Sequence, residues 1–211
     1  MRLCDQPQRF PPLGVPWLAD AAPRAATQGL GLGGKGGGAY LFSSKSFAKG
    51  AIMTAKIDTG LTKAERTGVA QELSKVLADS FAVYLKTHGY HWNVRGPEFF
   101  TVHNLLEQQY RDIWAALDEI AERIRALGEF APQAHSAFAN LTSIKDGDPE
   151  RDAPAMLQEL MKDHETLIAT CRAALTVADD EGDDVSVDLI TQRLAAHEKF
   201  AWMLRATLGG R

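Results

Sequence analysis

Apolar residues recur at helical spacing along most of the chain after residue 61. The first such stretch opens with a capping box, Thr62-Lys-Ala-Glu65, whose side chains satisfy the free amide groups at the start of a helix. We expect this helix to end near Trp92. Gly96-Pro97 then interrupts the pattern and starts a second helix, whose apolar stripe stops before Gly128.

Two more long helices and one short helix follow. The pattern predicts a short helix near Ala134–Leu141, a third long helix that begins near Asp152, and a fourth from about Val185 to Leu208. The acidic residues 179–184 form a solvated turn between the last two helices. Four long amphipathic helices predict an all-α fold, a four-helix bundle with a short extra helix between its second and third helices.

Residues 1–52 follow a different pattern. They hold nine of the 18 glycines and five of the nine prolines, and no apolar period persists in them. We therefore predict a flexible Gly/Pro-rich extension at 1–52 and one folded domain at 53–211. Met53 is an alternative translation start, because Lys49-Gly50 would be encoded by a purine-rich sequence that resembles a bacterial ribosome-binding sequence. On that interpretation the native protein lacks residues 1–52.

Charge separates the same two regions. Six basic and two acidic residues give residues 1–52 a net charge of +4, which leaves −8 for the other 159 residues, because the whole chain carries −4. An acidic domain attracts cations and disfavours nucleic acid unless the basic extension contributes.

The lack of a membrane-spanning stretch and of a disulfide framework bears on the cellular compartment that we expect. No apolar stretch approaches the ~20 residues that span a bilayer, so no membrane partner is expected. Cys4 and Cys171 lie far apart, which favours a reducing, cytoplasmic setting over a disulfide framework.

Potential metal ligands gather at the end of the first helix and along the second. His91 lies in the last turn of the first helix. His103 and Glu107 are one helical turn apart on the second helix, and so are Asp118 and Glu122. Imidazoles combined with carboxylates suit iron or manganese and are acceptable to zinc. The alternative is that the acids are surface charges, with Glu122 paired to a neighbouring arginine, Arg123 or Arg125.

The spacing of these residues argues for a site between two chains. His103 and Asp118 are 15 residues apart, which is about 22 Å along a helix, so they cannot bind one ion within one chain. They are nevertheless only about 60° apart around the helix axis. A second copy of the helix, antiparallel about a two-fold axis near Asp112–Ile113, would place His103 and Glu107 opposite the other copy's Asp118 and Glu122. Such a dimer contains two identical sites.

Residues 86–128, KTHGYHWNVRGPEFFTVHNLLEQQYRDIWAALDEIAERIRALG, resemble the signature of the Dps mini-ferritins (DNA-binding proteins from starved cells). The resemblance covers about residues 60–208, through HEKFAWMLRATL at 197–208. Its specific elements are His-Trp, a glycine four residues later, a second histidine and Asp-x-x-x-Glu-Arg. It implies a ferritin-like bundle and a hollow dodecamer, built from two-fold dimers, that oxidises Fe(II), typically with hydrogen peroxide, and stores Fe(III).

The resemblance also assigns residue roles. It places an intersubunit ferroxidase centre on His91, His103, Glu107, Asp118 and Glu122. Some family members have Asp where this chain has Glu107. For Trp92, beside the site, two interpretations stay open: passing an electron to the oxidant, or packing alone. Ferritins with an intrasubunit di-iron site use Glu-x-x-His motifs, which this sequence lacks.

Two other functions stay open beside iron oxidation. One is a structural protein that coats and compacts DNA in stationary phase, associated with the nucleoid, whose sequence support is the basic extension. The other is a protein that traps zinc or manganese without turnover.

Further polar residues fall within the helical stripes. His164 and His197 are interpreted as structural, and His88 as a packing residue or a transient ligand. Asp152, Glu159 and Asp163 share a helical face. They form either the lining of a cation channel in an assembled shell or a solvated surface.

Overall fold

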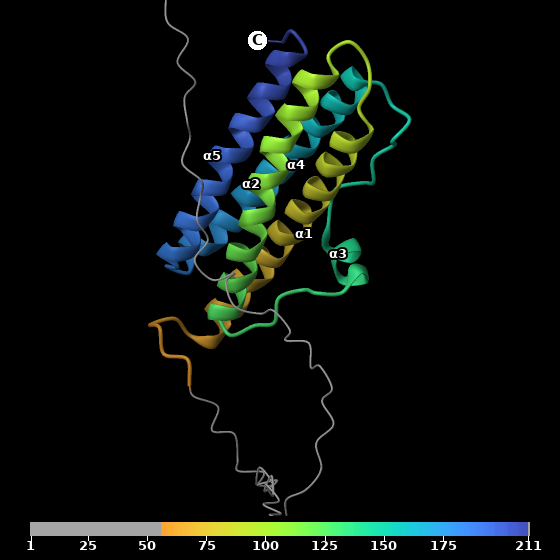
Figure 1. Cartoon of the computed structure of the whole chain (residues 1–211). Coiled ribbons are helices and arrows are strands. Elements are labelled where there is room, and N and C mark those ends of the chain that lie inside the picture. The colour runs from red at the N-terminus through yellow and green to blue at the C-terminus, as the bar shows by residue number, and fades with distance from the viewer. Residues whose placement is uncertain (1–55, 211) are drawn as a thin grey trace, which may run out of the picture. The chain divides into compact units, whose positions relative to one another are not determined.

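The computed structural model describes residues 56–210, which form a bundle of helices (Figure 1). The helices are α1 (Lys63–Asn93), α2 (Phe99–Ala126), α3 (His135–Leu141), α4 (Ala153–Asp180) and α5 (Asp184–Thr207). No strand occurs among these residues. The predicted all-α bundle with a short helix between its second and third long helices is confirmed. The predicted extension at 1–52 and Met53 lie outside the described residues.

Local sequence signals set the helix ends. Thr62 and Glu65 form the predicted capping box, and the Glu65 amide donates to Thr62 Oγ1 over 3.3 Å. Asp152 caps α4 by accepting from the Ala155 amide at 2.9 Å. Gly128, with φ of 97°, follows the end of α2. The second helix begins at Phe99, two residues later than predicted, because Pro97 lies in the turn before it.

The four long helices pack as neighbours in a ring. α1 contacts α2 and α4, while α5 packs along α4 and also touches α2. The short α3 lies against α1, outside the ring of long helices (Figure 1). The buried carboxylate of Asp79 on α1 anchors the segment after α3. It accepts hydrogen bonds from the Thr142 hydroxyl at 2.8 Å and the Ser143 amide at 2.6 Å.

Histidines occupy part of the bundle interior. His164 on α4 and His197 on α5 are both fully buried, and their Nδ1 atoms lie 3.1 Å apart. Burial, the largest effect, lowers the pKa of His164 to about 3, and the charge of Arg193 adds to this. The pKa of His197 also lies well below its usual value, for the same leading reason. Both imidazoles are therefore neutral near pH 7, as expected of structural histidines.

A buried lysine forms ion pairs between α1 and α4. Lys86 on α1 contacts Asp163 at 2.7 Å and Glu159 at 3.5 Å, both on α4. These two acids are thus held by a buried lysine, and Asp152 serves as a helix cap. The three do not form one free acidic face. Within residues 56–210, no helix has the length and apolar character needed to cross a membrane.

Candidate metal centre

Two of the predicted ligands meet where α1 ends beside the start of α2. The rings of His91 and His103 stack with their centroids 3.7 Å apart and their planes 19° apart. His91 lies in the last turn of α1, where backbone carbonyls lack an intrahelical donor. The carbonyl of His91 instead accepts a hydrogen bond from Nδ1–H of His103 at 2.8 Å.

The hydrogen bonding between these histidines is reciprocal. Nδ1–H of His91 donates to the backbone carbonyl of His103 over 2.9 Å. A carbonyl oxygen can only accept, so both rings carry their proton on Nδ1. In the neutral form of each ring the Nε2 atom therefore keeps its lone pair, which is the state that binds a metal ion. This pair is preorganised as two nitrogen ligands held by the backbone of two helices.

Glu107 lies one turn beyond His103 and is already paired. Its carboxylate accepts from Nε of Arg111 at 2.9 Å and lies 2.6 Å from a second guanidinium nitrogen. The hydrogen bond from Arg111 is the largest effect holding the pKa of Glu107 below its usual value, and the nearby His91 and His103 contribute. Glu107 is therefore an ionised carboxylate near both histidines. The guanidinium of Arg111 is the cation that pairs with it.

The other two predicted ligands lie elsewhere on α2. Asp118 and Glu122 are exposed, and neither forms a hydrogen bond or ion pair with another described residue. No group of three potential ligand side chains converges on one point within residues 56–210 of a single chain. A single chain thus brings His91 and His103 into contact, with Glu107 one helical turn beyond His103, and leaves Asp118 and Glu122 apart from them.

The alternative pairing for Glu122 is wrong. Arg123 binds Asp183 at 2.5 Å and the Ser186 hydroxyl at 2.9 Å, which fastens α2 to the start of α5. Arg125 donates to the carbonyl of Glu129 at 2.7 Å. Arg123 and Arg125 thus pair with other groups, and the Glu122 carboxylate stays exposed to solvent.

An aromatic cluster that sequence reasoning missed adjoins the histidine pair. His88 stacks on Tyr110 at 3.9 Å between centroids, and its Nδ1 lies 3.2 Å from the Tyr84 hydroxyl. Tyr110 also meets His91 edge-on at 5.1 Å, and Tyr84 packs against Trp114 at 5.2 Å. The available signal was the spacing of residues 103, 107, 110 and 114, which places them on one face of α2.

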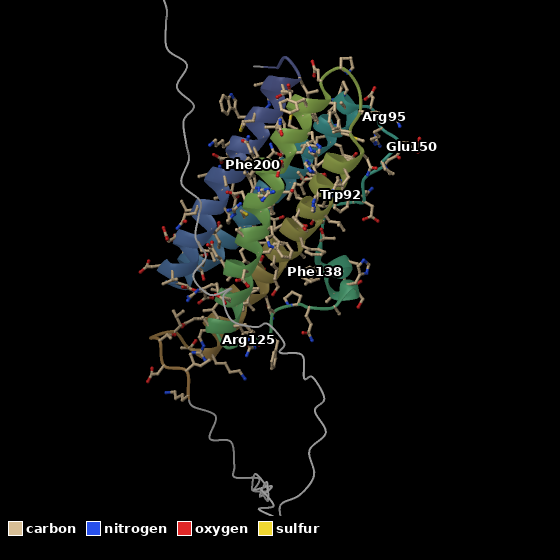
Figure 2. The ribbon with its side chains drawn as sticks, viewed as in Figure 1. Trp92, Arg95, Arg125, Phe138, Glu150 and Phe200 are labelled. Atoms are coloured by element: carbon tan, nitrogen blue, oxygen red, sulfur yellow. The ribbon has the colours of Figure 1, made fainter. Side chains whose placement is uncertain are left out.

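Trp92 lies at the edge of this cluster. Its ring is 4.2 Å from that of His88, while 61% of the residue stays exposed on the α1 side of the bundle (Figure 2). Burial, followed by the charges of His91 and Arg111, lowers the pKa of His88. His88 is thus a neutral ring packed between aromatic side chains, which agrees with its interpretation as a packing residue.

Comparison with known proteins places the fold and the sequence in one family. Residues 70–210 match the Ferritin family, described as a ferritin-like domain. A low temperature-induced protein of Nostoc sp. is 38% identical over 158 residues, which are 74% of this chain and 88% of that protein. The DNA protection during starvation protein 2 of Bacillus anthracis is 34% identical over 140 residues, 66% of this chain and 96% of that protein.

A solved structure agrees with these relatives. The Dps protein of Vibrio cholerae O1, described as a member of a broad superfamily of ferritin-like diiron-carboxylate proteins, superposes with a TM-score of 0.68 at 32% identity. The match covers 70% of this chain and 93% of that one. The bundle, the helix order and the sequence relatives agree: the chain belongs to the Dps family of mini-ferritins.

Proposed function

We propose that this protein is a ferroxidase and iron-storage mini-ferritin that oxidises Fe(II), with hydrogen peroxide, and sequesters Fe(III). The observation that carries the proposal is the reciprocal hydrogen bonding of His91 and His103, which leaves both Nε2 atoms ready for a metal ion. Iron is the substrate and the stored product. The diiron-carboxylate description of the Vibrio cholerae relative supports the same metal.

The site is completed by a second copy of the chain. One chain supplies His91, His103 and Glu107, and its two-fold partner supplies Asp118 and Glu122. The open carboxylates of Asp118 and Glu122 support this arrangement, because each lacks a partner among the described residues of its own chain. Each dimer then holds two identical centres, and such dimers assemble into the dodecamer that the family resemblance implies.

Exposed apolar side chains support contact between copies on this side of the bundle. Large hydrophobic side chains of α1 and α2 near the histidines stand in solvent: Leu85 at 49%, Trp92 at 61%, Phe99 at 43%, Phe100 at 75% and Trp114 at 59% exposed. A group of apolar side chains this large and exposed is typical of a protein–protein interface. A second copy would cover it and the candidate metal centre together.

The chemistry follows from the ligand set. Two Fe(II) ions give up one electron each, and one hydrogen peroxide accepts both electrons and two protons to form two water molecules. Carboxylates favour the more highly charged Fe(III), so Glu107, Asp118 and Glu122 stabilise the product while the histidines bind Fe(II). The reaction consumes peroxide and free iron together, so it limits hydroxyl radicals and protects DNA and cell. Trp92, beside the site, is a candidate for passing an electron to the oxidant.

A mixing experiment tests the shared site. One variant lacks both histidines (His91→Ala, His103→Ala), and the other lacks both distant acids (Asp118→Ala, Glu122→Ala). Each shell alone should be nearly inactive in Fe(II) oxidation, because every site lacks half of its ligands. After unfolding, equal mixing and reassembly, half of the dimers are mixed, and each has one complete site. We therefore expect about a quarter of wild-type activity.

The control is each variant unfolded and reassembled alone, which should stay inactive. Native mass spectrometry of the mixture establishes that both variants share shells. Shells that contain both chains and recover no activity would rule out the intersubunit site, because a site within one chain cannot be rescued by mixing.

Two assays separate catalysis from simple binding. Anaerobic Fe(II) followed by hydrogen peroxide should produce ferric absorbance, whereas a protein that only traps zinc or manganese would produce none. Zn(II) in excess over subunits should inhibit the reaction, because it competes for the same nitrogen and oxygen ligands and has no redox chemistry. Full activity in the presence of zinc would place the reaction at a different site.

DNA compaction is the second candidate function. The observation in its favour is the net charge of +4 on residues 1–52, since residues 53–211 carry −8. A gel shift that compares the full chain with residues 53–211 tests it. Binding that is lost on truncation and weakens steeply with salt would assign DNA binding to the extension. Equal binding by both would exclude that assignment.

A further inference from the structure

The interior of the bundle is divided into two separate apolar clusters. One contains Val83 and Leu167, and the other contains Tyr90 and Leu160. Buried polar residues lie between these apolar residues on both helices: Lys86 and Thr87 on α1, of which Lys86 pairs with Asp163, and His164 on α4. On α2, Gln109 lies between the two clusters in the same way, whereas His197 on α5 lies between two residues of the first cluster. We call four fully buried polar residues, one from each long helix, the polar layer: Thr87, Gln109, His164 and His197.

Observed contacts place the four residues at one level of the bundle. His88 stacks on Tyr110, so Thr87 on α1 is level with Gln109 on α2. Lys86 pairs with Asp163, so Thr87 is also level with His164 on α4.

Contacts of α5 with α4 and α2 place His197 at the same level as the other three residues. His164 and His197 contact each other directly. Arg193, one turn before His197 on α5, binds Asp112, one turn after Gln109 on α2, over 2.7 Å. Gln109 and His197 are therefore also level. The layer crosses the whole bundle.

The polar layer is buried, and several of its polar side-chain atoms are not paired with any other described protein atom. All four residues are at most 1% exposed. Five of their side-chain atoms have no hydrogen-bond partner among the described atoms: Oγ1 of Thr87, Oε1 and Nε2 of Gln109, Nε2 of His164 and Nε2 of His197. Nε of the neighbouring Arg193 is in the same condition. Buried polar groups in folded proteins almost always have partners, so this concentration points to a ligand.

The chemistry of the layer selects the ligand. The two histidines share one proton between their Nδ1 atoms, so one Nε2 is a donor and the other is an acceptor. Gln109 and Thr87 also offer both donors and acceptors. The layer contains no carboxylate, and the positive charge of Arg193 acts on both imidazoles, which disfavours a cation. A small neutral molecule that both donates and accepts hydrogen bonds fits all of these groups.

We propose that Thr87, Gln109, His164 and His197 form an internal hydration site that binds a cluster of ordered water molecules across the centre of the bundle. A buried water makes at most about four hydrogen bonds, so five groups require about two waters or more. This site is separate from the candidate metal centre and does not depend on the proposed iron chemistry. It lets four polar side chains occupy the core at one level of the bundle.

A crystal structure of the full-length wild-type chain, at a resolution that shows ordered water, tests the proposal directly. We expect water density within hydrogen-bond distance of the Gln109 amide and of at least one Nε2 atom in the layer. Anomalous diffraction and metal analysis on the same crystals distinguish water from an ion. A dry layer, or a metal ion between the two imidazoles, would overturn the proposal.

A matched pair of variants adds a second test. Gln109→Leu combined with Thr87→Val makes half of the layer apolar, and the waters bound there should disappear. Gln108→Leu alters the adjacent exposed residue by the same chemistry and should leave them in place. Water retained in the layer variant at the same positions would contradict the assignment of these side chains. The wild-type structure decides the question if the layer variant does not fold.

Discussion

Two histidine pairs in this bundle differ in almost every respect except residue type. His91 and His103 join α1 to α2 at one end, and each ring uses Nδ1 to bind a backbone carbonyl. His164 and His197 join α4 to α5 in the interior, near Phe200 on α5 (Figure 2), and their Nδ1 atoms face each other. The first pair keeps two free Nε2 lone pairs beside a carboxylate. The second pair is surrounded by the core and faces the charge of Arg193.

The difference shows that a histidine's role is decided by what holds its other nitrogen. A backbone carbonyl sets the tautomer and leaves the opposite nitrogen as a ligand. A second imidazole shares the proton instead, which leaves one donor and one acceptor to be satisfied inside the protein. Both pairs come from helical stripes that look alike in the sequence. The two pairs differ in chemistry only because helix packing gives their Nδ1 atoms different hydrogen-bond partners.

The largest effect is expected for a substitution that removes one histidine of the candidate ligand pair. His103→Ala should slow Fe(II) oxidation about 100-fold, because one of two nitrogen ligands is lost and His91 loses an oriented neighbour. Initial rates of ferric absorbance after peroxide addition measure this. His135→Ala, at an exposed histidine of α3, is the control and should keep its rate. Equal rates in the two variants would remove the histidine pair from the mechanism.

The next effect breaks the buried pair. His197→Ala should lower the free energy of unfolding by about 2–3 kcal/mol, because it opens a cavity and leaves Nδ1 of His164 without its partner. His103→Ala should cost less than about 1.5 kcal/mol, the value of one hydrogen bond. Denaturant unfolding at one fixed protein concentration compares them. A larger loss for His103→Ala would reverse the structural contrast between the pairs.

A third expected effect is a pH dependence of the folding stability that comes from the buried histidine pair. The pKa of His164 is about 3 in the folded protein, against its usual 6.5, and that of His197 is also lowered. The unfolded chain therefore binds more protons below pH 6.5. Stability is complete above that pH and is lost as the pH falls toward the folded pKa values.

Between pH 6.5 and 5.5 each buried histidine should cost about 1 kcal/mol of stability. Unfolding curves at the two pH values measure the loss. His197→Ala should reduce this pH dependence, while His135→Ala should not change it. A wild-type protein equally stable at both pH values would show that the buried pair accepts protons without penalty.

The smallest effect sharpens the description of the metal centre. Arg111→Ala removes the cation that holds Glu107, and the pKa of Glu107 should rise toward its usual value. Because the carboxylate is then free, Fe(II) affinity at pH 7 should increase, by less than about fivefold for so exposed an ion pair. Anaerobic Fe(II) titration measures it. Weaker Fe(II) binding in this variant would mean that Arg111 supports the site.

Much of the fold could be predicted from local signals. The capping box at Thr62, the stop at Gly128 and the short helix near residues 134–141 all appear in the structure, because each depends on residues within one or two helical turns. The structure places His91 in contact with His103, and their role as ligands of one site stays a prediction. The aromatic stack of His88 on Tyr110 was missed, because an aromatic residue in a helical stripe usually indicates packing.

The sequence by itself determined the helices, their apolar faces and the ligand types, because these follow from the chemistry of neighbouring residues. Tertiary structure alone decided the partners. Arg123 forms its ion pair with Asp183, 60 residues away, and not with the adjacent Glu122. His164 contacts His197, 33 residues away. Charge and hydrogen bonding act through space, so side chains that are distant in the sequence become partners only when the helices are packed. Helix packing likewise places one histidine pair at a candidate iron site and the other in the core.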